Sequence, residues 1–197
     1  MQSLRNLLVV ALATCLVACS HSTMTPTDAS SPATPDAQGS GLSTADVSEA
    51  MTWGASDNVR QIKHIYIASQ PDDAALQRAQ AAGVTTVVNL REPHEYDWNE
   101  QAATAVLGMK YLNIPIPKQG ASFDRMTLQR IERIVMQNRD GGVLLHCSSG
   151  NRAAAWLAAH LTDTHGMSDP EALAIAGKAG LTHAATKERV QRYMDER

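Results

Sequence analysis

Apolar and polar positions follow two alternating patterns from about residue 62 to the C-terminus. Short apolar or β-branched runs predict strands over 62–68, 84–90, 111–116 and 143–146. Helical spacing predicts helices over 72–82, 98–107, 124–139, 152–165, 169–179 and 184–194. Strands that alternate with helices are typical of an α/β fold with a mostly parallel sheet covered by helices on both faces.

The first 19 residues have the layout of an export signal. Arg5 supplies a positive start, and residues 7–18 are almost wholly apolar but too short for a comfortable membrane span. The run ends in Leu16-Val17-Ala18-Cys19, which resembles the bacterial lipobox. That resemblance implies a lipid on Cys19, although ordinary signal cleavage would leave an incidental thiol there. We therefore expect residues 1–19 to be a lipoprotein signal peptide.

The residues after Cys19 are rich in Ser, Thr, Pro and Ala. A segment of this composition buries too little apolar surface to fold, so residues 20–50 are expected to be a flexible linker and residues 51–197 the folded domain. Ser20 in place of Asp resembles lipoproteins sorted to the outer membrane. The expected location is thus the bacterial cell envelope, with the chain exported and lipid-anchored in the outer membrane, facing the periplasm.

Charge and cysteine content narrow the chemistry. A net charge of −3 and a pI of about 6.1 give no reason to expect a nucleic-acid partner. Cys15 would leave with the signal peptide and Cys19 would carry lipid, so Cys147 is the remaining free thiol and no disulfide framework is expected. The histidines lack HExxH spacing, and we predict neither a metal nor another cofactor.

The segment VLLHCSSGNRAAAW, residues 143–156, carries the most specific signal. A predicted strand ends just before Cys147, a short loop follows, and a helix begins near Arg152. A tight loop at a helix N-terminus directs several N–H groups at an anion, and the same environment stabilises a thiolate. An arginine fork can hold two phosphate oxygens. The segment therefore predicts a nucleophilic cysteine facing a bound tetrahedral anion.

Cys147-Ser-Ser-Gly-Asn-Arg152, with His146 before it, resembles the signature loop of cysteine-based protein tyrosine phosphatases. Four residues separate Cys from Arg where that superfamily usually has five. The shorter loop resembles a bacterial nonclassical branch, the beta-lactamase-hydrolase-like phosphatases. Three further stretches support the branch: IASQP at 67–71, GVTTVVNLRE at 83–92 and YLNIP at 111–115. The resemblance implies a cysteine-phosphatase-like fold and hydrolysis of phosphate monoesters, with phosphotyrosine among the candidate substrates.

The resemblance also implies roles for individual residues. Cys147 would attack phosphorus and form a phosphocysteine, and His146 would be structural. The phosphoryl oxygens would be held by Arg152 together with the loop residues Ser148, Ser149, Gly150 and Asn151. Ala153 stands where the family usually has a Ser or Thr that helps the thiolate leave.

The general acid is the least defined part of the predicted site. No acidic residue occurs over 115–123, so Asp124 is the nearest candidate, although Asp is also a preferred helix N-cap. Glu95 and Asp97 are further candidates, and Arg91 and Glu92 are an alternative structural pair near the site.

Two other functions fit parts of the sequence. Rhodanese-like sulfurtransferases also use a short Cys-x-x-Gly-x-Arg type of loop, and NLREPHE at 89–95 resembles one of their stretches. Their Gly-His-Ile-x-Gly-Ala segment is missing after Glu95, which favours the phosphatase. A domain that binds phosphorylated ligands without turnover also fits, because of Ala153 and the undefined acid.

Overall fold

The computed structural model describes residues 41–197, so the predicted signal peptide, Cys19 and most of the predicted linker lie outside the described residues. The described part begins earlier than the predicted domain boundary at residue 51. A short 3-10 helix, η1 (Thr44–Asp46), is followed by Val47, which is buried and forms a β-bridge with Ile62. Within residues 41–197, no helix is both long and apolar enough to cross a membrane.

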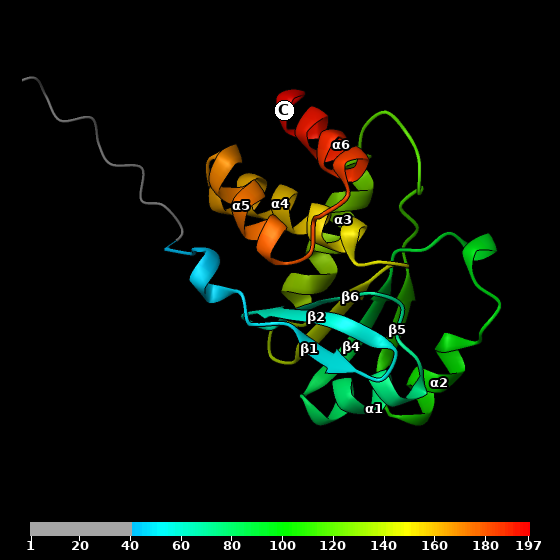
Figure 1. The fold of residues 1–197 in the computed structure, drawn as a ribbon. Helices are drawn as coiled ribbons and strands as arrows, with labels where there is room; N and C mark the ends of the chain where they lie inside the picture. The colour runs from blue at the N-terminus through cyan, green and yellow to red at the C-terminus, as the bar shows by residue number, and fades with distance from the viewer. Residues whose placement is uncertain (1–40) are drawn as a thin grey trace, which may run out of the picture. The chain divides into compact units, whose positions relative to one another are not determined.

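Six strands form one sheet in the order β1-β2-β3-β6-β4-β5 (Figure 1). Their bounds are β1 (Met51–Trp53), β2 (Ser56–Ile62), β3 (Ile65–Ala68), β4 (Val84–Asn89), β5 (Lys110–Asn113) and β6 (Gly142–His146). The strands β3, β6, β4 and β5 are parallel, and β2 and β1 continue the sheet in antiparallel pairing. The predicted α/β fold with a mostly parallel sheet is confirmed.

Helices cover both faces of this sheet, as predicted. On one face lie α1 (Asp73–Ala81) and α2 (Glu100–Val106); on the other lie α3 (Arg125–Gln137), α4 (Asn151–His165), α5 (Asp169–Lys178) and α6 (Ala184–Asp195) (Figure 1). Each predicted helix is present, with ends that differ by a few residues at most. A further 3-10 turn, η2 (Pro93–Glu95), follows β4.

The structure differs from the prediction around residue 62. The predicted strand 62–68 is split by a turn at Lys63, whose φ of 53° lies in the left-handed region, and the chain reverses into an antiparallel pair of β2 with β3. The sequence of β2, SDNVRQI, has little apolar character, and Val59 and Ile62 are its buried apolar residues. An edge hairpin of this composition gives a weak periodic signal, which is why β1 and β2 were not predicted.

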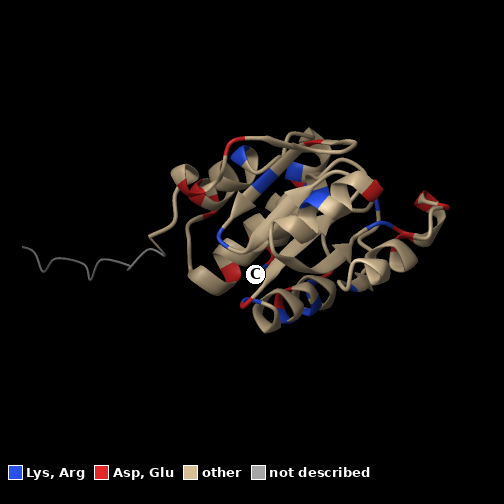
Figure 2. Cartoon of the chain, turned by 90° about the horizontal axis from the view of Figure 1, so that it is seen from below, with Lys and Arg blue, Asp and Glu red and all other residues tan. Residues whose placement is uncertain are grey.

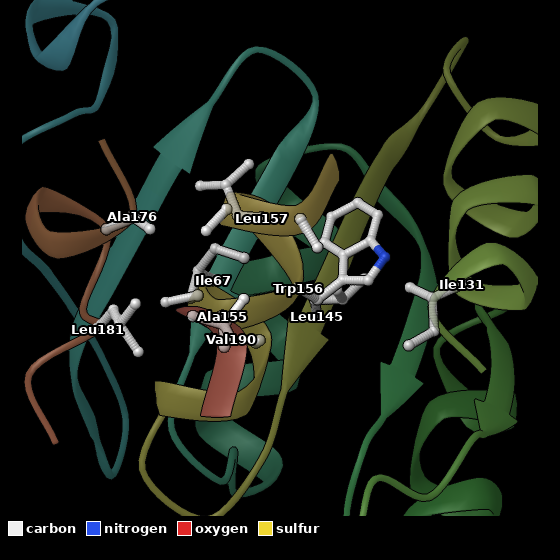
Figure 3. Packing of buried hydrophobic residues seen from close by; sticks show 14 of the residues in the cluster. Ile67, Ile131, Leu145, Ala155, Trp156, Leu157, Ala176, Leu181 and Val190 are labelled. Carbon is white, nitrogen blue, oxygen red and sulfur yellow. The ribbon is translucent and has the colours of Figure 1, made fainter. Parts of the chain in front are cut away.

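The larger core lies between the sheet and the helices α3 to α6. Figure 3 shows Trp156 and Leu157 of α4 against Leu145 of β6 and Ile67 of β3. The alanines of α4 from 153 to 159 are at most 2% exposed, so this helix packs closely on its neighbours. Strand β6 and helix α4 are therefore both held rigidly, on either side of the loop that joins them.

The connection order of the sheet defines where a site forms. Strand β6 lies between β3 and β4, although the chain passes through β5 and α3 before it returns there. The loops after β3, β6, β4 and β5 therefore emerge at the same edge, around a point where the strand order reverses. Open α/β sheets bind ligands at such a point.

Charged residues give this domain no strongly polarised half. Figure 2 shows Lys and Arg interspersed with Asp and Glu over the helices and loops. Binding of an anion therefore depends on the local arrangement of a few side chains rather than on the charge of the whole domain.

Candidate active site

Cys147 follows directly on β6, and its side chain is buried, with 1% of the residue exposed. Ser148 and Ser149 are exposed, whereas Gly150 is buried and occupies the N-cap position of α4 with a φ of 82°. A Cβ at Gly150 would lie 3.4 Å from the carbonyl oxygen of Ala68, so both the backbone angle and the space favour glycine. The result is a tight turn that places the cysteine beneath the first, unpaired N–H groups of a 15-residue helix.

Arg152 lies in the first turn of α4 and is 4% exposed. Its Nη1 donates to the carbonyl oxygens of Ile116 at 2.9 Å and Leu90 at 3.3 Å. Its Nη1 and Nη2 also form a two-bonded pair with the carboxylate of Glu95, at 2.6 and 2.7 Å. The guanidinium is thus fixed to the loops that follow β4 and β5.

The fixed orientation leaves part of the guanidinium for a ligand. Among the oxygens of the described residues, Nη2 has one further partner, the exposed Ser148 hydroxyl at 3.3 Å, and Nε has none. Burial by itself lowers the pKa of Arg152, but the hydrogen bond with Glu95 and the charge of Cys147 outweigh it and raise this pKa. Arg152 therefore stays charged within electrostatic reach of Cys147, with one edge of its fork available.

Glu95 is the partner of this arginine, a role that the sequence did not reveal. The hydrogen bond from Arg152 lowers the pKa of Glu95 to about 2, against desolvation that acts in the opposite direction. Its Oε1 also accepts from the backbone N–H of Glu92, closing the η2 turn at 2.8 Å. A carboxylate that is ionised and paired in this way is poorly suited to donate a proton.

His146 and Glu100 form a second buried pair under the loop. The Nε2 atom of His146 lies 2.7 Å from Oε1 of Glu100, and both side chains are at most 1% exposed. The other carboxylate oxygen of Glu100 accepts from Asn89 at 2.9 Å and from Gln70 at 3.4 Å. The pair joins β6 to α2, β4 and the loop after β3, so His146 is held among these elements beneath the loop.

Asn151 anchors the other side of the loop. Its Oδ1 accepts from the backbone N–H groups of Thr182 at 2.8 Å and His183 at 2.7 Å, and its Nδ2 lies 3.4 Å from the Ser149 hydroxyl. The predicted loop residues therefore lie close together. The side chain of Asn151 binds the segment before α6, so the part of Asn151 that can bind a ligand is its backbone N–H.

Asp124 occupies the N-cap of α3. Its Oδ2 accepts from both the N–H and the hydroxyl of Thr127 at 2.7 Å, and these hydrogen bonds lower the pKa of Asp124. It also lines a cavity shared with Ile116 and Arg189, so it lies near the strand end that Arg152 contacts. The structure thus supports the capping role of Asp124 directly. Its lowered pKa makes Asp124 a poor general acid.

Replacing Asp124 by alanine separates the two roles. Loss of the cap is expected to lower the free energy of unfolding by about 1 kcal/mol. If capping is its main function, kcat for an aryl phosphate falls less than threefold and the pH profile keeps its shape. Denaturant unfolding and steady-state kinetics on the same preparation measure both, and a hundredfold loss of kcat together with disappearance of the alkaline limb of the pH profile would identify Asp124 as the acid instead.

The remaining predicted residues take other partners. Arg91 donates to Gln70 and lies over the Tyr96 ring, while Glu92 accepts from the backbone N–H of Lys118 at 3.2 Å. No ion pair joins Arg91 to Glu92 in the described part of the chain. Asp97 is exposed. Among residues 41–197 there is also no cluster of three or more acidic, His or Cys side chains that could hold a metal.

Comparison with protein families gives one match that covers most of the described chain. The family described as "Swiss Army Knife protein, DSP-PTPase phosphatase domain" matches residues 59–197. No curated protein matches the chain.

Solved structures share the fold at low sequence identity. Tk-PTP in its active form is 22% identical with a TM-score of 0.60, covering 74% of this chain and 99% of that one. TpbA of P. aeruginosa is 18% identical with a TM-score of 0.56, covering 71% and 84%. PTPMT1 in complex with PI(5)P is 19% identical with a TM-score of 0.57, covering 68% and 92%. At these identities the likeness shows the fold.

Proposed function

Because the chain belongs to the DSP-PTPase phosphatase domain family of Swiss Army Knife proteins, and is thereby a cysteine phosphatase of the tyrosine-phosphatase-like type, we propose that it hydrolyses aryl phosphate monoesters through a phosphocysteine at Cys147. Phosphotyrosine is the natural member of that substrate class. The observation that carries the proposal is the placement of a buried thiol under a helix N-terminus beside a buried, oriented arginine.

The proposed reaction has two displacements. In the first, the Cys147 thiolate attacks phosphorus, an S–P bond forms, and the P–O bond to the alcohol breaks. In the second, water attacks the phosphocysteine, the S–P bond breaks, and inorganic phosphate leaves while the thiolate returns. Arg152 and the N–H groups of residues 148–152 stabilise the equatorial oxygens, whose charge is greatest in the transition state.

The leaving alcohol must receive a proton unless it is already a stable anion. Glu95 is committed to Arg152, and Asp124 has a lowered pKa, so neither is well placed to supply that proton. Aryl oxides leave without much help, whereas alkoxides do not. This difference supports the assignment of aryl phosphates over alkyl phosphates.

The test is hydrolysis of para-nitrophenyl phosphate by the reduced protein, by three variants of the site and by one control variant. Cys147→Ser is expected to lower kcat by a thousandfold or more, and Arg152→Ala by about a hundredfold or more. Arg152→Lys keeps the charge without the fork, and Arg130→Ala removes an exposed arginine of α3 as a matched control. Phosphocysteine would be trapped by acid quenching with labelled substrate. Equal rates for the parent and folded Cys147→Ser would refute the proposal.

One of the two other functions predicted from the sequence now has less support. The family match favours phosphoryl transfer over sulfur transfer from thiosulfate. A binding domain without turnover would bind the substrate stably and release no inorganic phosphate, so the same assay distinguishes it from the enzyme.

We further propose that the chain is an exported lipoprotein acylated at Cys19, with its domain in the periplasm. The motif Leu16-Val17-Ala18-Cys19 at the end of an apolar segment supports this. The measurement is incorporation of labelled palmitate into the parent and into Cys19→Ala. Equal labelling of the two, or none in the parent, would contradict the proposal.

A further inference from the structure

Arg189 of α6 is a buried cation without an acidic partner. Its residue is 5% exposed, and no carboxylate of residues 41–197 lies within ion-pair distance of its guanidinium. Its Nη1 donates to the carbonyl oxygens of Pro117 at 3.0 Å and Lys118 at 3.2 Å, and its carbon Cζ lies 4.5 Å from the centre of the Phe123 ring. The Nε atom is buried and has no hydrogen-bond partner.

This environment is short of negative charge. Burial lowers the pKa of Arg189, and the charges of Arg152 and Arg192 lower it further. A buried charge of one sign is unfavourable unless it is paired, and the unpaired Nε adds the loss of a hydrogen bond. An anion bound beside Arg189 would compensate its charge and could accept a hydrogen bond from Nε.

Arg189 lies close to the proposed phosphate loop because the two arginines hold one stretch of backbone. Arg152 donates to the carbonyl of Ile116, and Arg189 donates to the carbonyls of the next two residues, Pro117 and Lys118. Consecutive carbonyl oxygens of an extended chain point in different directions and lie roughly 6 Å apart at most. The two Nη1 atoms are therefore separated by roughly 12 Å or less.

Two cavities adjoin Arg189. One, of about 140 Å³, is also lined by Ile116, Gly120 and Phe123. The other, of about 200 Å³, is lined by Lys118, Arg192 and Glu188. Glu188 forms no ion pair with either arginine in the described part of the chain, so the second cavity has three cationic side chains and one unpaired carboxylate.

We propose that Arg189, with Lys118 and Arg192 beside it, is a second anion subsite that binds a second phosphate group of the substrate. The inference rests on the proposed phosphatase site and deepens it, since it narrows the substrate class to small aryl phosphates that carry a second phosphate group. The first phosphate would lie in the Cys147 loop and the second at Arg189. Phosphate suits this subsite because a dianion matches several neighbouring cations.

A purely structural role for these arginines makes a different prediction. Arg189 and Arg192 both hold carbonyl groups of the loop over 117–122, and this alone would stabilise the loop. Lys118 separates the two roles, because its exposed side chain lines the second cavity and holds no part of the loop. A subsite needs Lys118 for affinity, whereas a structural clamp does not.

The experiment compares 1,4-phenylene bisphosphate with phenyl phosphate as ligands of the full chain. Binding is measured by calorimetry on Cys147→Ser, which cannot turn over, and by inhibition of para-nitrophenyl phosphate hydrolysis in the parent. We expect the bisphosphate to bind at least tenfold more tightly. Lys118→Ala and Arg192→Ala should each reduce that ratio at least threefold, while the matched Arg130→Ala keeps it. The preference should also fall steeply with salt.

The outcomes separate this inference from the proposed activity. The deciding quantity is the affinity for the bisphosphate divided by the affinity for the monophosphate. A value near one in the parent, or a value unchanged in Lys118→Ala and Arg192→Ala, overturns the second subsite even when para-nitrophenyl phosphate is hydrolysed. A ratio that depends on these residues in a protein without hydrolysis supports the subsite and overturns the enzyme.

Discussion

Replacing Glu95 by glutamine is expected to lower the free energy of unfolding by about 3 kcal/mol at neutral pH, because the change leaves Arg152 as an unpaired buried cation. The side chains of this pair are 5% and 8% exposed, so solvent screens their interaction little. The arginine would also lose its orientation, and kcat/KM should fall by at least tenfold. Urea unfolding and para-nitrophenyl phosphate kinetics measure the two effects.

The pH dependence follows from the low pKa of Glu95. The group has an ordinary pKa of 4.5 when unfolded and about 2 when folded. Its contribution to stability is therefore fully present above pH 4.5 and is lost as the pH falls toward 2. The parent and Glu95→Gln should differ most at neutral pH and least near pH 2.

An exposed pair provides the matched control. Glu49 and Lys178 also lie 2.7 Å apart, but their side chains are 87% and 37% exposed. Glu49→Gln should leave stability unchanged within error. A loss of stability in Glu95→Gln no larger than in Glu49→Gln would show that the buried pair does not hold the arginine.

Removal of the Glu100 carboxylate is the second large effect. Glu100→Ala is expected to lower the free energy of unfolding by about 3 kcal/mol, since it removes the buried carboxylate that contacts His146 and accepts hydrogen bonds from Asn89 and Gln70. The loop after β6 should loosen, and kcat should fall more than KM rises. The measurements are urea unfolding and kinetics, with the exposed Glu196→Ala as control.

The conservative variant distinguishes packing from charge. Glu100→Gln keeps the shape and can still accept from Asn89, so most of the stability should return. If Glu100→Gln and Glu100→Ala have the same kcat, within twofold of the parent, Glu100 does not position the catalytic loop.

The sequence predicted most of the fold because its strands and helices carry strong periodic signals. The run VTTVVN of β4 is buried at five of six positions, and α3 has buried residues at Leu128, Ile131 and Val135 on one face. The hairpin of β1 and β2 gave no such signal, because its residues are mixed in polarity and its pairing depends on a turn at Lys63.

The site was predictable where neighbouring residues form it and less so where distant ones do. Cys147 and Arg152 belong to one short loop, so their chemistry could be inferred from spacing. Glu95 was predicted as a candidate acid, but its partner lies 57 residues away and only the folded structure brings them together. Arg189 gave no signal in the sequence, since its burial depends on the loop that packs over it.

The position of β6 in the sheet has a consequence for how the protein is made. The ribosome synthesises β3 and β4 well before β6. These two strands do not pair with each other, because β6 lies between them and pairs with both. Contacts of such large sequence separation form late and slowly. Until β6 has been synthesised, β3 and β4 each keep one unpaired edge. The pocket around Cys147 therefore forms only when β6 pairs with both strands.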